Sequence, residues 1–125
     1  MVLERILYVD DDPNLRALFE VALGSDASMK LAICASGPEA VDTAPEFRPQ
    51  LIVLDVNMPG MDGPATLAEL RANGESSPAV FVTAETGLEE LKRLKSLGVE
   101  EIVPKPFDAL SLTQKLTRIW QQATA

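Results

Sequence analysis

Five short apolar runs alternate with five amphipathic segments along this chain, and this alternation restricts its fold more than any other feature. The runs predict strands at about 5–9, 30–35, 51–54, 79–82 and 101–103. In the segments between and after them, apolar residues recur at helical spacing. Strict alternation of strand and helix implies parallel strands joined by right-handed crossovers. We therefore expect an α/β fold, a doubly wound (βα)5 five-stranded parallel sheet with helices on both faces.

The first helix is expected to span 13–23, and signals mark both of its ends. Pro13 suits a first helical turn, and Asp12 before it can cap the helix. The segment Gly24-Ser25-Asp26 should end it. Charged residues such as Arg16 should point outward, and the stripe that faces the core should comprise Leu15, Leu18, Phe19 and Ala22.

Proline, glycine and aspartate mark the ends of the other helices. Pro45 and Pro49 should bound the short second helix on its far side. Gly98 is expected to cap the C-terminal end of the fourth helix, and Asp108 the start of the last. The fourth helix is marked by leucines at helical spacing, Leu88, Leu91, Leu94 and Leu97.

Two of the apolar runs end in carboxylates. Asp10 and Asp11 follow the first run, and Asp55 closes the third. In an open α/β sheet, ligands bind beyond the carboxyl ends of the strands. Like charges about 4 Å apart repel by roughly 4 kcal/mol at an effective dielectric near 20, so a bound cation would relieve this cluster. The chain has no histidine, and its one cysteine, Cys34, is distant in sequence, so oxygen ligands favour a hard ion such as Mg²⁺.

Two further polar residues should reach the same edge of the sheet. Thr83 follows the fourth run and Lys105 the fifth. A hydroxyl can bond a phosphoryl oxygen, an ammonium can neutralise it, and a carboxylate can attack phosphorus. Considered one at a time, these residues have simpler structural explanations. Asp12 can be a helix cap, Thr83 an ordinary strand residue and Lys105 a solvated turn residue. An acid such as Asp55 is costly to desolvate unless it is paired, and the joint placement of the set favours a magnesium site that handles phosphate.

Length and charge restrict the class of protein. A chain of 125 residues fits one domain, so we take 1–125 as a single domain. Its formal net charge of −8 argues against this domain gripping a nucleic acid by itself. No apolar run approaches the ~20 residues that span a bilayer. We expect no signal peptide, because the N-terminus leads directly into the first predicted strand. With its lone Cys34, the chain is expected to be cytoplasmic.

Four motifs carry a resemblance to a known family. They are Val9-Asp10-Asp11-Asp12-Pro13, Leu54-Asp55-Val56-Asn57-Met58-Pro59-Gly60-Met61-Asp62-Gly63, Val82-Thr83-Ala84 and Lys105-Pro106-Phe107. In these motifs, over essentially its whole length, the chain resembles the receiver domain of two-component response regulators, including the chemotaxis regulators. The second motif is the most specific. The resemblance implies the flavodoxin-like strand order 2-1-3-4-5.

The resemblance also implies a phosphorelay function. Asp55 would accept a phosphoryl group from a phosphohistidine of a sensor histidine kinase or a histidine phosphotransfer protein. The domain would catalyse only its own phosphorylation and dephosphorylation, so it would be a signalling phosphoacceptor rather than an enzyme. Asp11 and Asp55 would bind Mg²⁺ directly, the backbone carbonyl of Asn57 would add a ligand, and Asp10 would act largely through water.

The remaining matched residues would stabilise and transmit the phosphorylated state. Lys105 would pair with the phosphoryl group, and Thr83 would swing to hydrogen-bond it. This movement would remodel the face built from the fourth helix, the fifth strand and the fifth helix, which binds an output partner that the sequence does not identify. Small Ala84 would leave the acyl phosphate accessible, and the Lys105–Pro106 bond is a candidate for the cis conformation.

The chain departs from the family pattern at Ile102, where an aromatic side chain commonly rotates inward when the threonine moves. Pro104 also removes a backbone donor, which predicts a short fifth strand. The residues two past the acceptor and two past the threonine influence phosphoryl lifetime in the family. Here they are Asn57 and Glu85, which suggests a fairly labile phosphoryl group.

Three rival functions can be compared with these residues. An aspartyl-phosphate phosphatase needs a second acid two residues past the nucleophile, where this chain has Asn57. A Ca²⁺ loop starting at Asp10 would need glycine and glutamate where Leu15 and Val21 stand. A receiver-like interaction module that works without phosphorylation stays open because of Ile102.

Overall fold

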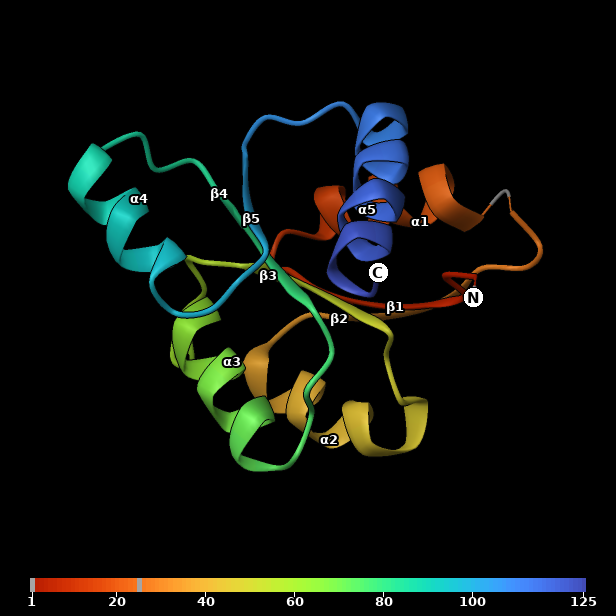
Figure 1. Cartoon of the computed structure of the whole chain (residues 1–125), viewed down its shortest axis with the longest axis horizontal. Coiled ribbons are helices and arrows are strands. Elements are labelled where there is room, and N and C mark those ends of the chain that lie inside the picture. Colours follow the sequence, from red (N-terminus) through yellow and green to blue (C-terminus); the bar gives the residue numbers. More distant parts are fainter. Residues whose placement is uncertain (1, 25) are drawn as a thin grey trace.

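Figure 1 shows the alternation of strands and helices as a layered structure, in a computed structural model that describes residues 2–24 and 26–125. Ser25, expected in the segment that ends the first helix, lies outside the described residues. The elements are β1 (Arg5–Val9), α1 (Pro13–Gly24), β2 (Lys30–Cys34), α2 (Gly37–Phe47), β3 (Leu51–Asp55), α3 (Gly63–Ala72), β4 (Ala79–Thr83), α4 (Leu88–Lys95), β5 (Glu101–Pro104) and α5 (Ala109–Ala123).

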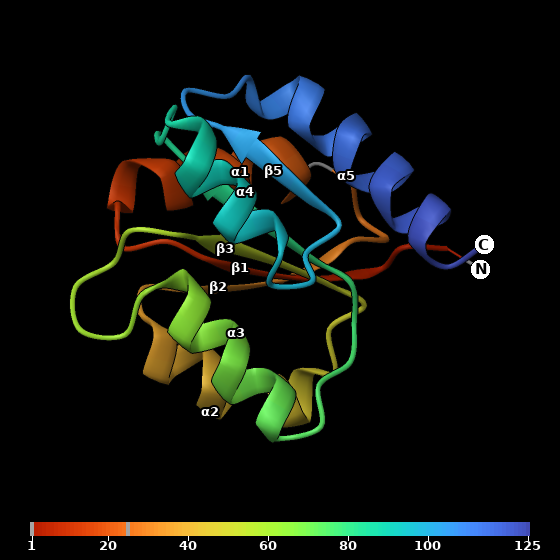
Figure 2. The same ribbon diagram turned by 60° about the vertical axis from the view of Figure 1, so that its left-hand side comes forward.

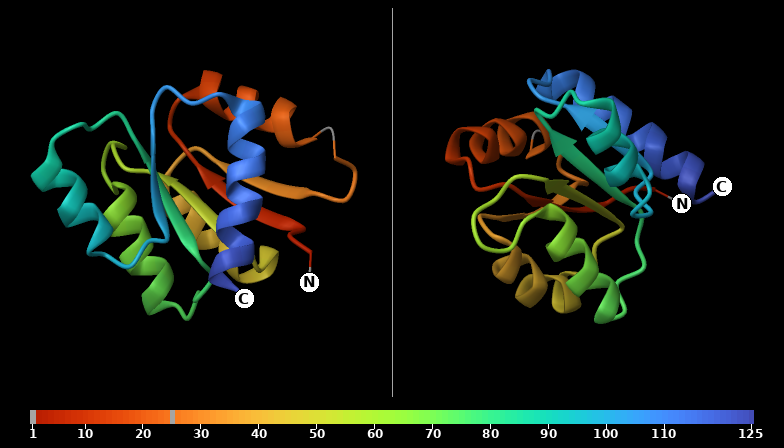
Figure 3. Two further views of the ribbon diagram at one scale, coloured as in Figure 1. Left: turned by 45° about the horizontal axis from the view of Figure 1, so that its top comes forward. Right: turned by 90° about the vertical axis from the view of Figure 1, so that its left-hand side faces the viewer.

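The strands form one parallel sheet in the order β2-β1-β3-β4-β5, which confirms the predicted fold class and strand order. Side chains of the central strands are almost entirely buried, as expected for apolar runs covered on both faces. Successive residues enter different cores: Leu7 packs with residues of α2 and α3, and Ile6 with residues of α1 and α5. Figures 2 and 3 show these two helix pairs on opposite sides of the sheet.

The first helix begins as predicted but buries a narrower stripe. Asp12 Oδ1 accepts a 2.8 Å hydrogen bond from the N–H of Asn14, as a cap should. Phe19 is buried, whereas Leu18 is 44% exposed, so its predicted place in the core was wrong. The reason is that α1 packs beside α5 and over β2, which leaves the side of the helix that carries Leu18 facing solvent. Within the described residues, no helix combines the length and the apolar character needed to cross a membrane.

Two other predictions about helices need correction. Pro45 does not end α2, which continues to Phe47. A proline in the last turn removes only one hydrogen bond, and Arg48 N–H closes the turn on Ala44 O at 2.8 Å. In α4, Leu94 alone of the four predicted leucines is buried; Leu88 and Leu97 are exposed, and Leu97 lies beyond the helix. Asp108 caps α5 as expected, accepting from Leu110 N–H.

The direction of the strands places the two ends of the chain away from the acidic edge. All five strands point their carboxyl ends to the same edge, and α5 runs back across the sheet. Figure 2 shows the start of β1 and the end of α5 close together at the opposite edge. Residues expected to act chemically therefore gather at one edge of the sheet, and the start of β1 and the end of α5 lie at the other.

Candidate functional site

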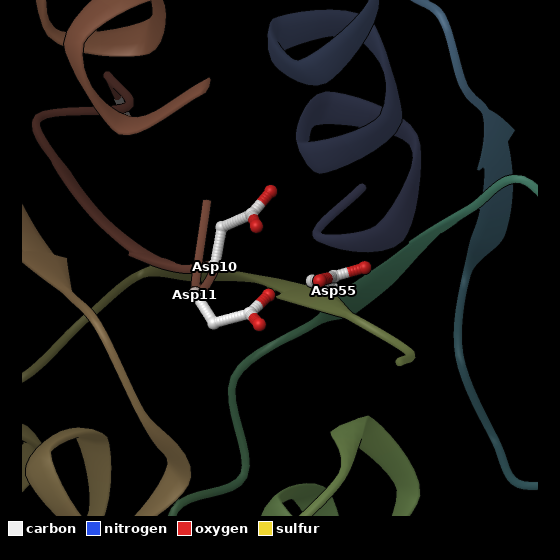
Figure 4. Close-up of side chains that lie close together, drawn as sticks. All are labelled: Asp10, Asp11 and Asp55. Atoms are coloured by element: carbon white, nitrogen blue, oxygen red, sulfur yellow. The ribbon is translucent and has the colours of Figure 1, made fainter. Parts of the chain in front are cut away.

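Three carboxylates meet at the carboxyl edge of the sheet (Figure 4). Asp10 and Asp11 follow β1, and Asp55 is the last residue of β3; Val9 and Leu54 pair in register, so the acids that follow them are neighbours. One oxygen from each of the three acids lies within 4.8 Å of the others. Asp10 and Asp55 are buried and Asp11 is exposed. This set of oxygen ligands, open to solvent on one side, fits a hard, partly hydrated cation such as Mg²⁺.

Asp10 is held firmly by the surrounding chain. Its Oδ2 accepts a 2.7 Å hydrogen bond from the hydroxyl of Tyr8, and its Oδ1 accepts a 3.0 Å bond from the N–H of Asp12. Arg16, expected to point outward, instead turns back and donates to the backbone carbonyl of Asp10 at 2.9 Å. With both oxygens engaged by protein donors, Asp10 is better suited to reach an ion through water than to bind it directly.

Lys105 connects the two buried acids. Its Nζ donates to Asp55 Oδ1 at 3.0 Å and lies 3.4 Å from Asp10 Oδ2. Burial disfavours the charged ammonium, but the hydrogen bond to Asp55 and the two carboxylate charges outweigh burial and raise the pKa of Lys105. The Lys105–Pro106 bond is cis, as predicted. The backbone N–H of Lys105 donates to Thr83 O at 2.8 Å, which joins the ends of β4 and β5.

The carboxyl group of Asp55 has a pKa shifted from its usual value. Burial raises its pKa to about 6, with the charge of Asp10 adding to the shift and Lys105 opposing it. At neutral pH the carboxylate is therefore mainly ionised and can act as a nucleophile. Perturbed acids of this kind, beside a cation and at the end of a buried strand, are typical of functional sites.

Thr83 lies at the end of β4 with its side chain buried. Its Oγ1 accepts a 3.0 Å hydrogen bond from the N–H of Glu85, and the Glu85 carboxylate accepts in turn from the N–H groups of Thr86 and Gly87. Beside Thr83 is a cavity of about 190 Å³, which has Ile102 in its wall. Its other lining residues are Glu85, Leu91 and Pro104.

The segment after Asp55 returns close to the end of β3. Gly60 has a φ of 75°, a left-handed conformation that favours glycine. A Cβ on Gly63 would lie 2.5 Å from Asp55 O and 2.8 Å from Val56 Cα, so only glycine fits at the start of α3. Asp62 caps this helix by accepting from Ala65 N–H at 2.9 Å. Asn57, the predicted carbonyl ligand, is exposed in this loop.

The structure thus brings together Asp10, Asp11, Asp55 and Lys105, with Thr83 on the adjoining strand. One residue of the site was missed from the sequence. Tyr8 was treated only as part of an apolar run, although it carries the one polar side-chain atom between Ile6 and Val9 and precedes Asp10 by two residues. Since alternate strand residues share a face, that spacing was a usable signal.

Comparisons with known proteins point to the same family as the sequence motifs. A family model for the response regulator receiver domain matches residues 6–117. The DNA-binding response regulator MtrA of Mycolicibacterium smegmatis is 33% identical over 113 residues, which cover 90% of this chain and 49% of that protein. The response regulator MprA of Mycolicibacterium vanbaalenii is 33% identical over 121 residues, covering 96% and 52%. This chain therefore spans about half the length of these relatives.

Among solved structures, the chemotaxis response regulator CheY4 of Vibrio cholerae matches with a TM-score of 0.83 and 29% identity, covering 94% of this chain and 99% of that one. The signal receiver domain of a putative LuxO repressor protein from Vibrio parahaemolyticus matches with a TM-score of 0.86 at 24% identity, covering 98% and 94%. The second likeness bears on the fold alone.

Proposed function

This chain belongs to the response regulator receiver domain family, and on that premise we propose that Asp55 accepts a phosphoryl group from a phosphohistidine of a partner protein. The partner is a sensor histidine kinase or a histidine phosphotransfer protein. The observation that carries the proposal is the 3.0 Å contact between Lys105 Nζ and Asp55 Oδ1, beside the acidic pair Asp10–Asp11. These groups supply a nucleophile, a cation for the phosphoryl oxygens and an acidic metal site.

In this reaction an oxygen of Asp55 attacks phosphorus, the O–P bond forms as the N–P bond breaks, and the imidazole leaves with the electron pair. Lys105 neutralises charge on the transferred phosphoryl group. Its Nζ already lies beside Asp55 Oδ1, so it is close to the position that the phosphoryl oxygens will occupy. Asp11, Asp55 and the carbonyl of Asn57 would hold Mg²⁺, with Asp10 acting through water. When bound, Mg²⁺ supplies positive charge that stabilises the transferring phosphoryl oxygens.

Phosphorylation adds nearly two negative charges where Lys105 now pairs with Asp55. We expect Thr83 Oγ1 to leave the N–H of Glu85 and donate to a phosphoryl oxygen. The cavity beside Thr83 and Ile102 leaves room for this rearrangement. The face formed by α4, β5 and α5 would then change shape and bind the output partner, without the rotation of an aromatic ring.

Other properties of the protein are proposed on the same basis. The chain 1–125 acts as one receiver domain and works in the cytoplasm. Its net charge of −8 supports a role in which this domain does not itself bind DNA. The phosphoryl group is expected to be fairly labile, because polar Asn57 lies two residues past the acceptor and acidic Glu85 two residues past Thr83. A half-life of many hours in Mg²⁺ would contradict this expectation.

Intact-mass measurement after incubation with acetyl phosphate and Mg²⁺ tests the proposal. One phosphoryl adduct should form on the wild type and on the control variant Asp62→Asn. Asparagine at this position can still cap α3, and the position lies away from the three acids. Asp55→Asn and an EDTA-treated sample should form none. A folded wild-type protein that gains no adduct would contradict phosphoacceptor function and would favour an interaction module that works without phosphorylation.

A further inference from the structure

Tyr8 brings a buried hydroxyl to the functional edge of the sheet. Its side chain is fully buried in β1, and its ring stacks on Phe19 of α1 with centroids 4.0 Å apart and an interplanar angle of 7°. Two residues later the chain reaches Asp10, whose side chain leaves the backbone on the same face. The Tyr8 hydroxyl therefore meets Asp10 Oδ2, at 2.7 Å.

A phenyl ring would fill the same space without a polar atom. Burying a hydroxyl is unfavourable unless it finds a partner, so tyrosine is suited to this position because Asp10 accepts its hydrogen bond. Burial raises the pKa of Tyr8 above its usual value, and the hydrogen bond to Asp10 and the nearby carboxylate charges raise it further. The hydroxyl accordingly stays protonated and acts as a donor.

The two carboxylate oxygens of Asp10 lie close to different donors. Oδ1 accepts from the N–H of Asp12 at 3.0 Å; Oδ2 accepts from Tyr8 and lies 3.4 Å from Lys105 Nζ. The same ammonium lies closer to Asp55 Oδ1, at 3.0 Å. A carboxylate oxygen that already accepts one strong hydrogen bond attracts a second donor less. The Tyr8 hydroxyl thus favours pairing of Lys105 with Asp55 over pairing with Asp10.

We propose that Tyr8 is a positioning residue for phosphoryl transfer, an inference that rests on the proposed role of Asp55. Its hydroxyl holds Asp10 in one orientation and leaves the ammonium of Lys105 to Asp55 and to the phosphoryl oxygens that Asp55 receives. Tyr8 touches no reacting atom. It acts through Asp10 and then through Lys105.

The first test compares Tyr8→Phe with the wild type in the rate of phosphoryl uptake from acetyl phosphate. At saturating Mg²⁺ the rate should fall about 3- to 10-fold, the effect of one hydrogen bond that supports the reacting arrangement. The Mg²⁺ concentration for half the maximal rate should change by less than about twofold, because Tyr8 works on Asp10 and Lys105 rather than on the direct ligands. Phe19→Leu removes the stacked ring but keeps the hydroxyl, so it should lower thermal stability and leave the rate unchanged.

The second test needs no phosphorylation. Tyr8 is the chain's one tyrosine, so protein labelled with ¹³C at the tyrosine Cζ gives a single resonance that reports on this hydroxyl. Lys105→Met should shift the resonance in Mg²⁺-free protein, since Asp10 Oδ2 then depends more on Tyr8. The exposed Lys92→Met should leave it in place.

The outcomes separate the two proposals. Two results would overturn the positioning role: equal rates of phosphoryl uptake in the wild type and Tyr8→Phe, or a Tyr8 resonance that does not shift in Lys105→Met. Equal slowing by Phe19→Leu and Tyr8→Phe would also overturn it, since packing would then explain the effect. If the wild type takes up no phosphoryl group, the proposed function fails, and the resonance test alone decides whether Tyr8 positions Asp10 against Lys105.

Discussion

Lys105 Nζ donates a 3.0 Å hydrogen bond to Asp55 Oδ1 across 50 positions of sequence. The contact forms because β3 and β5 both end at the same edge of the sheet, with β4 between them. In the protein without metal, the ammonium offsets part of the repulsion among the three acids. It should therefore affect both stability and the proposed phosphoryl transfer, and these two effects can be measured separately.

Replacing Lys105 by alanine should leave Asp10 and Asp55 without their shared cation. The free energy of unfolding in EDTA should fall by at least about 1–3 kcal/mol, the range for a buried hydrogen-bonding group that loses its partner, since charged groups cost more. Phosphoryl uptake in Mg²⁺ should fall at least about tenfold, because positive charge at the transferred group is lost. Urea unfolding and intact mass measure the two effects. Lys92→Ala, on the exposed side of α4, is the control, and a similar loss in that variant would contradict a specific role for Lys105.

Mg²⁺ should stabilise the folded protein through Asp11. Binding to the folded state alone adds about 2.7 kcal/mol at a concentration 100 times the Kd, and the melting temperature should rise accordingly. Asp11→Asn should abolish this rise, and in EDTA it should be as stable as the wild type or more so, since one repelling charge is gone. Asp12→Asn is a matched neighbour, because asparagine also caps a helix. Thermal melts with and without Mg²⁺ in which both variants lost the response would contradict the assignment of the ligand to Asp11.

The pH dependence of stability in EDTA should carry the signature of Asp55. Its folded-state pKa, about 6, lies above the value of about 3.9 expected in the unfolded chain, so protonation favours the folded state. The stabilising contribution is fully present below the unfolded value and is lost as the pH rises through about 6. Urea unfolding between about pH 5 and about pH 7.5 should show stability falling more steeply in the wild type than in Asp55→Asn. Parallel curves of stability against pH for the two proteins would refute the contribution of Asp55.

The loop after the acceptor should tolerate no side chain at Gly63. A methyl group there meets backbone atoms of Asp55 and Val56, which cannot move aside as a flexible side chain can. Gly63→Ala should therefore lower the free energy of unfolding by about 1–3 kcal/mol and slow phosphoryl uptake by shifting Asp55. Gly24→Ala, where a Cβ would meet nothing within 4 Å, is the control. Chemical unfolding together with the intact-mass assay will distinguish the pair, and an unaffected Gly63→Ala would disprove the close approach.

The strands were predictable because buried apolar runs are a local property of sequence. Each predicted end at β3, β4 and β5 fell one residue short, since Asp55, Thr83 and Pro104 belong to the strands. Backbone pairing does not depend on side-chain polarity, and the ladder continues past the last apolar residue. Pro104 is tolerated because β5 lies at the margin of the sheet.

What the sequence could not supply was the set of neighbours around each helix and each polar atom. Leu18 and Leu88 fit a helical stripe, yet their exposure depends on which elements pack against α1 and α4. Arg16 was predicted to face outward, but a carbonyl six residues earlier accepts its guanidinium N–H. The bond between Tyr8 and Asp10 likewise depends on a side-chain conformation that spacing can suggest but not establish.

The start of β1 and the end of α5 lie at the edge of the sheet opposite the three acids. A surface anchor, an affinity tag or a fluorophore attached at either end will therefore sit away from Asp55. An immobilised protein will present the edge that carries Asp55 to solution, so the proposed binding of phosphodonor proteins can be tested without masking that edge.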